Sequence, residues 1–283
     1  MKKWTLFAAT AALTLGLAAC GDDNSSATGD NNSSTAGEET KEIKVGATAG
    51  PYSDMLSKAI IPQLEEKGYE VELVEFSDYI QPNKALDNGD IDANLFQHTI
   101  YLENFEKENN MDLEALKIVP TAPMGFFSNE FTSVEEIADG ATIALPNDPS
   151  NAARALLALQ EQGLITINPD VEELKASEKD VQDNPKNLVF QPIEAAGLPR
   201  AVESADLAAV PGNFALAAGL NLMDALFLEN MPDQYRNVVA VTAENKNSQL
   251  AKDLIEIVES EAFEQVIDEE FEGFGKPEWM VNR

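Results

Sequence analysis

From residue 42 onwards, short apolar segments of two different repeat lengths alternate along the chain. A period of two predicts a strand, and apolar residues spaced at i, i+3, i+4 and i+7 predict an amphipathic helix. The first strand is expected at Glu42–Thr48 and the first helix at Tyr52–Lys67, with a kink at Pro62 because proline cannot donate a backbone hydrogen bond. Further strands are expected at 71–76, 91–95, 116–120, 141–145, 188–191, 206–210 and 238–242, and further helices at 81–88, 98–109, 150–162, 178–183, 198–203, 213–218 and 248–268.

Strands and helices follow one another in two series, which predicts an α/β fold. The β-α-β-α-β order at the start of the first series requires right-handed crossovers and parallel strands. Residues 120–128 contain two prolines and a glycine, and this break in the alternation suits a passage between lobes. We therefore expect two lobes with a cleft: lobe 1 from residues 42–122 and 238–283, and lobe 2 from residues 123–237.

The N-terminus has the three-part layout of a secretory signal peptide. Lys2 and Lys3 precede an apolar run that ends in Leu-Ala-Ala-Cys at Cys20, so residues 1–20 are interpreted as a signal. This ending resembles the lipobox of bacterial lipoproteins, whose cysteine is acylated; the alternative is a cleavage nearby with an incidental cysteine. Residues 21–40 contain no large apolar side chain, and residues 21–41 are expected to form a disordered tether.

The charge of the chain excludes several classes of partner. Nineteen basic and 50 acidic residues give a formal net charge of −31, which becomes about −33 when Lys2 and Lys3 leave with the signal. Nucleic acids and anionic lipid surfaces are therefore poor partners. We assign the acidity itself no binding role.

A strand-to-helix junction is predicted near Phe96–His98, within the stretch Gly89–Leu102. Ligands of parallel sheets bind at the carboxyl ends of strands, so this stretch is expected to form one wall of a small-molecule pocket. His98 is the only histidine and has no cysteine beside it, so it lacks the companions of a zinc site. It is expected to contact a ligand; a structural role, or catalysis in a hydrolase, remains as an alternative.

The segment Pro146–Arg154 predicts a site for an anion. Asp148 is a suitable helix cap, Pro149 fits the first turn, and Arg154 follows about one turn later. A ligand carboxylate could receive a bidentate pair of hydrogen bonds from Arg154 while the helix N-terminus adds favourable partial charge. The alternative is that Arg154 is a solvated or salt-bridged surface residue.

Several aromatic residues are expected at the ends of elements or in connections, where a two-lobed binding protein holds an apolar side chain. Any one of them could instead belong to the core. They are Tyr79, Phe96, Tyr101, Phe126, Phe127 and Phe214.

Five motifs together resemble the NlpA lipoprotein family, whose best-known members are the MetQ-type methionine-binding proteins of ABC importers. The resemblance runs from about Ile43 to the C-terminus. The motifs are Phe76–Asn83, Gly89–His98 with Tyr101, Pro146–Asn151 with Arg154, Asn184–Asn187 and Leu198–Arg200.

The resemblance implies a two-lobed, type II periplasmic-binding-protein-like fold that closes on L-methionine or a related small amino acid. It implies a monomeric binding protein without a cofactor or enzymatic activity, anchored in the membrane through acylated Cys20, facing the extracytoplasmic side and delivering its ligand to an ABC importer permease. Arg154 would hold the ligand carboxylate, and Asn151 and Asn213 would hydrogen-bond its carboxylate and amino group. The side chain would lie among Tyr79, Phe96, His98 and Tyr101. Phe127 and Phe214 depart from the family, which often has tyrosine there.

Overall fold

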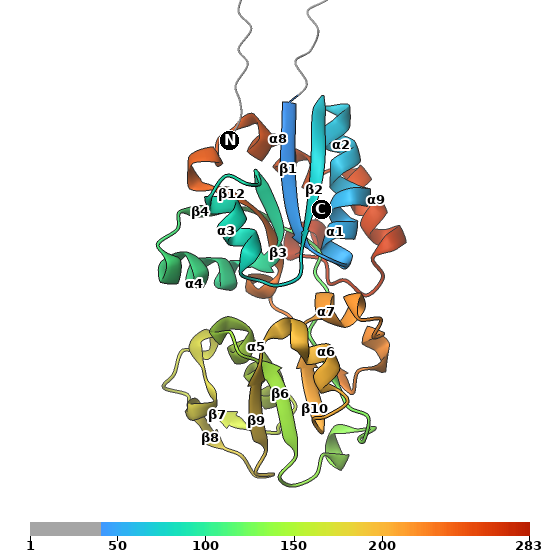
Figure 1. Ribbon diagram of the computed structural model, residues 1–283. Coiled ribbons are helices and arrows are strands. Elements are labelled where there is room, and N and C mark those ends of the chain that lie inside the picture. Colours follow the sequence, from blue (N-terminus) through green and yellow to red (C-terminus); the bar gives the residue numbers. More distant parts are fainter. Residues whose placement is uncertain (1–40) are drawn as a thin grey trace, which may run out of the picture. The chain divides into compact units, whose positions relative to one another are not determined.

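The computed structural model describes residues 41–283 (Figure 1). The expected signal peptide, Cys20 and all of the expected tether except Lys41 lie outside the described residues. Lys41 itself is the first residue of a strand. Within the described range, no helix has the length and apolar character needed to cross a membrane.

The first five-stranded sheet has the order β2-β1-β3-β12-β4. Its strands are β1 (Lys41–Thr48), β2 (Tyr69–Phe76), β3 (Ala93–His98), β4 (Leu113–Ile118) and β12 (Asn237–Thr242). β1 pairs in parallel with both β2 and β3, with Val45 opposite Leu73 and Ala93, which confirms the predicted parallel start. β12 enters from late in the sequence and runs antiparallel between β3 and β4.

The second five-stranded sheet has the order β11-β5-β10-β6-β9, and β7 and β8 form a separate pair. The strands are β5 (Gly125–Phe127), β6 (Thr142–Pro146), β7 (Thr166–Ile167), β8 (Val181–Asp183), β9 (Val189–Ile193), β10 (Leu207–Val210) and β11 (Phe227–Leu228). β6 pairs in parallel with β9 and β10, whereas β5 is antiparallel to β10 and β11. Figure 1 shows β6, β9 and β10 side by side beneath α5 and α6.

The helices are α1 (Pro51–Met55), α2 (Ile61–Glu66), α3 (Gln81–Asp87), α4 (Thr99–Asn109), α5 (Pro149–Glu161), α6 (Leu198–Ala201), α7 (Gly212–Ala217), α8 (Gln249–Val258), α9 (Glu261–Glu270) and α10 (Glu278–Val281). The predicted interruption near Pro62 is confirmed, because a π-helical turn at Leu56–Ile60 separates α1 from α2. The wider turn accommodates a proline that cannot donate and whose ring would crowd the preceding turn.

Two helix predictions are wrong. Residues 178–183 form a single 3₁₀ turn, which Ser177 and Asp180 cap, and then β8, because Val181 is extended and pairs antiparallel with Ile167 of β7. Residues 248–268 form two helices instead of one. The Ser260 hydroxyl accepts from the Phe263 N–H at 3.0 Å and starts α9 in a new direction.

The predicted first and last residues of some strands differ from those in the structure. β3 begins two residues later than expected and runs on through His98. The passage at 120–128 contains β5, which has only three residues and is too short to show a repeat in the sequence. The short strands β7, β8 and β11 were also missed.

Each sheet has its own hydrophobic core, which is why the chain forms two lobes. The core of the first sheet includes Val45, Leu95 and Val241 and is covered by Leu254 of α8 and Phe263 of α9. In the second sheet, the apolar face of α5 packs against residues of β5, β6 and β10; this core includes Phe126, Ile143, Leu145, Leu156 and Leu207.

Gly212, the first residue of α7, is required by a close approach of two backbones. A Cβ atom at this position would lie 2.4 Å from the Pro123 carbonyl oxygen and 2.6 Å from the Ala122 Cβ. We expect Gly212→Ala to lower the free energy of unfolding by about 2 kcal/mol through overpacking. Urea unfolding checks this, with Gly197→Ala as the control because its nearest contact would be at 3.2 Å. Equal urea midpoints for the two variants would contradict the prediction.

Candidate functional site

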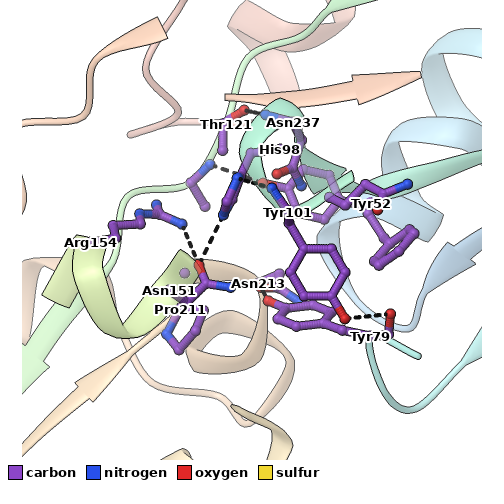
Figure 2. Close-up of a pocket in the computed structure, with 14 residues that line it drawn as sticks. Tyr52, Tyr79, His98, Tyr101, Thr121, Asn151, Arg154, Pro211, Asn213 and Asn237 are labelled. Atoms are coloured by element: carbon purple, nitrogen blue, oxygen red, sulfur yellow. Dashed lines mark hydrogen bonds between the residues drawn. The ribbon is translucent and has the colours of Figure 1, made fainter. Parts of the chain in front are cut away.

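The candidate site is a cavity lined by fourteen residues that come from strand ends, helices and connections of both lobes (Figure 2). All seven predicted ligand-binding residues line it: Tyr79, Phe96, His98, Tyr101, Asn151, Arg154 and Asn213. The sequence analysis missed the other seven, which are Tyr52, Gln97, Thr121, Ala122, Pro211, Gly212 and Asn237. The structure thus brings the predicted residues together, while their contact with a ligand stays a prediction.

One side of the cavity is aromatic. The Tyr79 ring centroid lies 5.9 Å from that of Phe96, 5.7 Å from that of Tyr101 and 4.8 Å from that of Phe214. The Tyr101 hydroxyl donates to the Tyr79 carbonyl oxygen at 3.0 Å and fixes the two rings against each other. Tyr79, Phe96 and Tyr101 line the cavity and form a preorganised apolar wall that suits an unbranched, polarisable side chain, whereas Phe214 belongs to a core cluster and packs against Tyr79.

Phe126 and Phe127 belong to the core of the second sheet instead of the cavity. Phe126 stacks on Phe227 at a centroid distance of 4.2 Å, and Phe127 is buried within the second lobe. For these two residues the alternative interpretation as core side chains is therefore the correct one.

His98 ends β3 and caps α4. Its Nδ1 accepts from the Tyr101 N–H at 3.1 Å, so in the neutral ring Nε2 carries the proton and donates to Asn151 Oδ1, also at 3.1 Å. Burial, together with the positive charge of Arg154, lowers the pKa of His98 to about 3. Both ring nitrogens thus make fixed hydrogen bonds, which supports a positioning role in the pocket wall.

Three amide side chains explain why the motif around β3 is rich in Asn and Gln. Asn83 of α3 and Gln97 of β3 exchange two hydrogen bonds of 2.6 Å, and Asn94 Nδ2 donates to Asn83 Oδ1 at 3.1 Å. All three side chains are buried. A satisfied buried network of this kind fixes α3 on the strand and so holds the aromatic wall in place.

The start of α5 confirms the predicted cap but changes the predicted anion site. Asp148 Oδ1 accepts from the Asn151 N–H and from the Ser150 hydroxyl, both at 2.9 Å, and the Asn151 side-chain amide donates to the same carboxylate at 3.1 Å. The negative charge of Asp148 therefore already occupies the N-terminus of this helix, where a ligand carboxylate was expected.

Arg154 is buried and ion-paired with Glu229, a residue that sequence reasoning missed. Its Nε donates to Glu229 Oε2 at 2.6 Å, and Nη2 donates to Glu229 Oε1. The exposed fractions of the two side chains are 6% and 4%, so the pair is not the surface salt bridge considered as an alternative. The bidentate pair expected for a ligand carboxylate is thus made with Glu229. Nη1 remains on the cavity side, 3.3 Å from Asn151 Oδ1 (Figure 2).

Asn213, near the start of α7, connects the second lobe to the first. Its Oδ1 accepts from the Tyr79 hydroxyl at 2.6 Å, and its Nδ2 donates to the Thr48 hydroxyl at the end of β1 at 3.4 Å. His98 and Asn151 make a second link of the same kind. Polar groups that can bind an amino acid are therefore the groups that join the two lobes.

Two separately packed α/β lobes with a buried polar and aromatic cavity between them define the class of two-lobed binding proteins. Residues 43–279 match the model of the NlpA lipoprotein family, and the chain belongs to this family.

Known relatives cover nearly the whole chain. The D-methionine-binding lipoprotein MetQ of Escherichia coli K12 is 33% identical over 282 residues, which are 98% of this chain and 99% of the relative. Outer membrane lipoprotein 3 of Mannheimia haemolytica is 35% identical over 274 residues, or 96% of this chain and 98% of that protein. A solved nutrient binding protein from Burkholderia cenocepacia, bound to methionine, is 38% identical with a TM-score of 0.77, covering 82% of this chain and 97% of that one.

Proposed function

We propose that this protein is a lipid-anchored, extracytoplasmic substrate-binding protein that captures methionine and delivers it to an ABC importer. The observation that carries the proposal is a buried arginine that faces an aromatic wall across one small cavity. The names of the relatives support methionine as the ligand, since they include D-methionine-binding lipoproteins and a methionine-bound structure. Another small amino acid is the alternative ligand.

The cavity suggests where each part of an amino acid binds. Arg154 Nη1 would hold the carboxylate beside Asn151, and Asn213 would accept a hydrogen bond from the ammonium group in place of the Tyr79 hydroxyl. The thioether would lie among Phe96, Tyr101 and His98, where sulfur–aromatic contacts contribute roughly 0.3 to 1.5 kcal/mol each.

Ligand exchange requires the lobes to separate. The space enclosed by the cavity side chains is about 10 Å³, which is room for about one water molecule and not for methionine. Opening would break the links of Asn213 to Tyr79 and Thr48, and a bound amino acid would replace them. We propose lobe boundaries of 42–122 with 238–283, and of 123–237, and a closed monomer whose surface the permease recognises.

The membrane attachment belongs to the part of the chain before the first strand. We propose that residues 1–20 are a signal peptide, that Cys20 is acylated, and that residues 21–41 act mainly as a tether. More than one acyl chain would anchor the protein stably, because each buried CH₂ contributes about 0.8 kcal/mol.

Calorimetry on the protein without residues 1–20 tests which ligand it binds. The protein is first unfolded and refolded to remove carried-over ligand. We expect saturable heat with L-methionine at micromolar concentrations, and the affinity for D-methionine is measured separately. Phe96→Ala should bind methionine at least about tenfold more weakly, because that truncation removes a buried aromatic contact. Binding of another amino acid without any heat from either methionine enantiomer would contradict the proposal.

A further inference from the structure

Glu229 is held in place behind Arg154 by the second sheet. It follows β11 directly, and its backbone N–H donates to the Met124 carbonyl oxygen at 3.0 Å. Its carboxylate accepts from the Met124 N–H in addition to Nε and Nη2 of Arg154. The position of this carboxylate is therefore set by strand pairing and not by the cavity.

This arrangement fixes the orientation of the Arg154 guanidinium group, and the Glu229 carboxylate balances its positive charge. With Nε and Nη2 turned towards Glu229, Nη1 is the edge that Arg154 presents beside Asn151. The negative charge of Glu229 balances the positive charge of Arg154 inside a buried environment, where such charges are poorly screened. His98 is neutral and Asp148 is the remaining charged group beside Asn151, so these groups give the site no net positive charge.

We propose that Glu229 is a specificity-determining positioning residue that makes the cavity selective for zwitterionic amino acids over anionic analogues without an ammonium group. This inference rests on the proposed amino-acid-binding function. A zwitterion adds no net charge to a site in which Arg154 is paired with Glu229 and Asp148 contributes one further negative charge. An analogue with only a carboxylate brings a negative charge that Arg154, already neutralised by Glu229, does not compensate.

Removing the charge of Glu229 should therefore reverse part of this preference. Glu229→Gln keeps the shape of the side chain and one acceptor for Arg154, but leaves the guanidinium charge unbalanced. The affinity for a carboxylate-only ligand should rise relative to that for a zwitterion, by about tenfold or more in the ratio of dissociation constants, because the charges interact within a poorly solvated region.

The experiment measures the dissociation constants of L-methionine and of 4-(methylthio)butanoate, which lacks the amino group, by calorimetry on refolded protein. Wild type should prefer L-methionine, and Glu229→Gln should lower that preference about tenfold or more. Glu130→Gln, at an exposed position of the same lobe, is the matched control and should leave the ratio unchanged. Equal weakening of both ligands in Glu229→Gln would overturn the inference, whereas wild type that binds no amino acid would overturn the proposed function instead.

A second variant keeps the inference testable if Glu229→Gln does not fold. A cavity of about 320 Å³ adjoins Arg154 and Glu229, so in Glu229→Ala water and small carboxylates can approach the guanidinium group. We expect the preference for L-methionine to fall in this variant and to return when acetate is added. A ratio that acetate does not change would overturn the inference, because the selectivity would then not depend on a negative charge at this place.

Discussion

Replacement of Arg154 by methionine is expected to lower the free energy of unfolding by about 3 to 5 kcal/mol and to abolish amino-acid binding. The loss of stability comes from Glu229, whose side chain is 4% exposed and would keep a buried charge without its partner. The loss of binding follows because Nη1 is the cationic donor that the cavity presents.

A double variant separates the two effects. Arg154→Met with Glu229→Gln removes both charges while the glutamine oxygen can still accept from the Met124 N–H, so most of the lost stability should return. Binding should remain absent. Urea unfolding at neutral pH measures the stability. Lys175→Met is the control, because Lys175 pairs with Glu172 at 68% and 60% exposure and should matter by less than about 1 kcal/mol. An Arg154→Met variant as stable as this control would contradict the prediction.

The order of elements and the parallel core of the first sheet could be predicted from periodicity, because long alternating segments such as β1 specify their own structure. Short strands could not. β5 and β11 have three and two residues. β5 forms because it pairs with β10 and β11, and β11 forms because it pairs with β5, so the information lies in the partner strands. The break between α8 and α9 was hidden for another reason: the apolar spacing continues across Ser260, and only its capping hydrogen bond shows the new start.

The residues that line the site were predicted more completely than the hydrogen bonds and ion pairs that they make. Local motifs identified both Arg154 and the aromatic wall, and Asp148 is the cap that the sequence indicated. The ion pair between the Arg154 guanidinium group and Glu229 could not be predicted, because Glu229 lies 75 residues further along the chain in a segment without a recognisable pattern. A single acidic residue among 50 gives no signal until the fold places it beside a buried arginine.

His98 is expected to make the folded state sensitive to acid. Burial, and then the charge of Arg154, lower its pKa from 6.5 to about 3, so the folded state resists a proton that the unfolded state accepts. The sign follows from this difference: the neutral ring imposes no penalty above pH 6.5, and stability falls progressively as the pH drops towards 3. Linkage gives a loss of about 2 kcal/mol at pH 5 and about 3 kcal/mol at pH 4 from this residue.

Comparison with His98→Gln isolates that contribution from the titration of the many carboxylates. Glutamine does not titrate and can still donate to Asn151 Oδ1, so the variant is expected to lose about 2 kcal/mol less than wild type between pH 7.5 and pH 5. Urea unfolding of both proteins at the two pH values provides the measurement. If the two stability profiles run parallel, His98 is not held neutral by the fold. A smaller loss in the variant would show that one buried imidazole, fixed between Tyr101 and Asn151, makes the stability of the folded protein depend on pH.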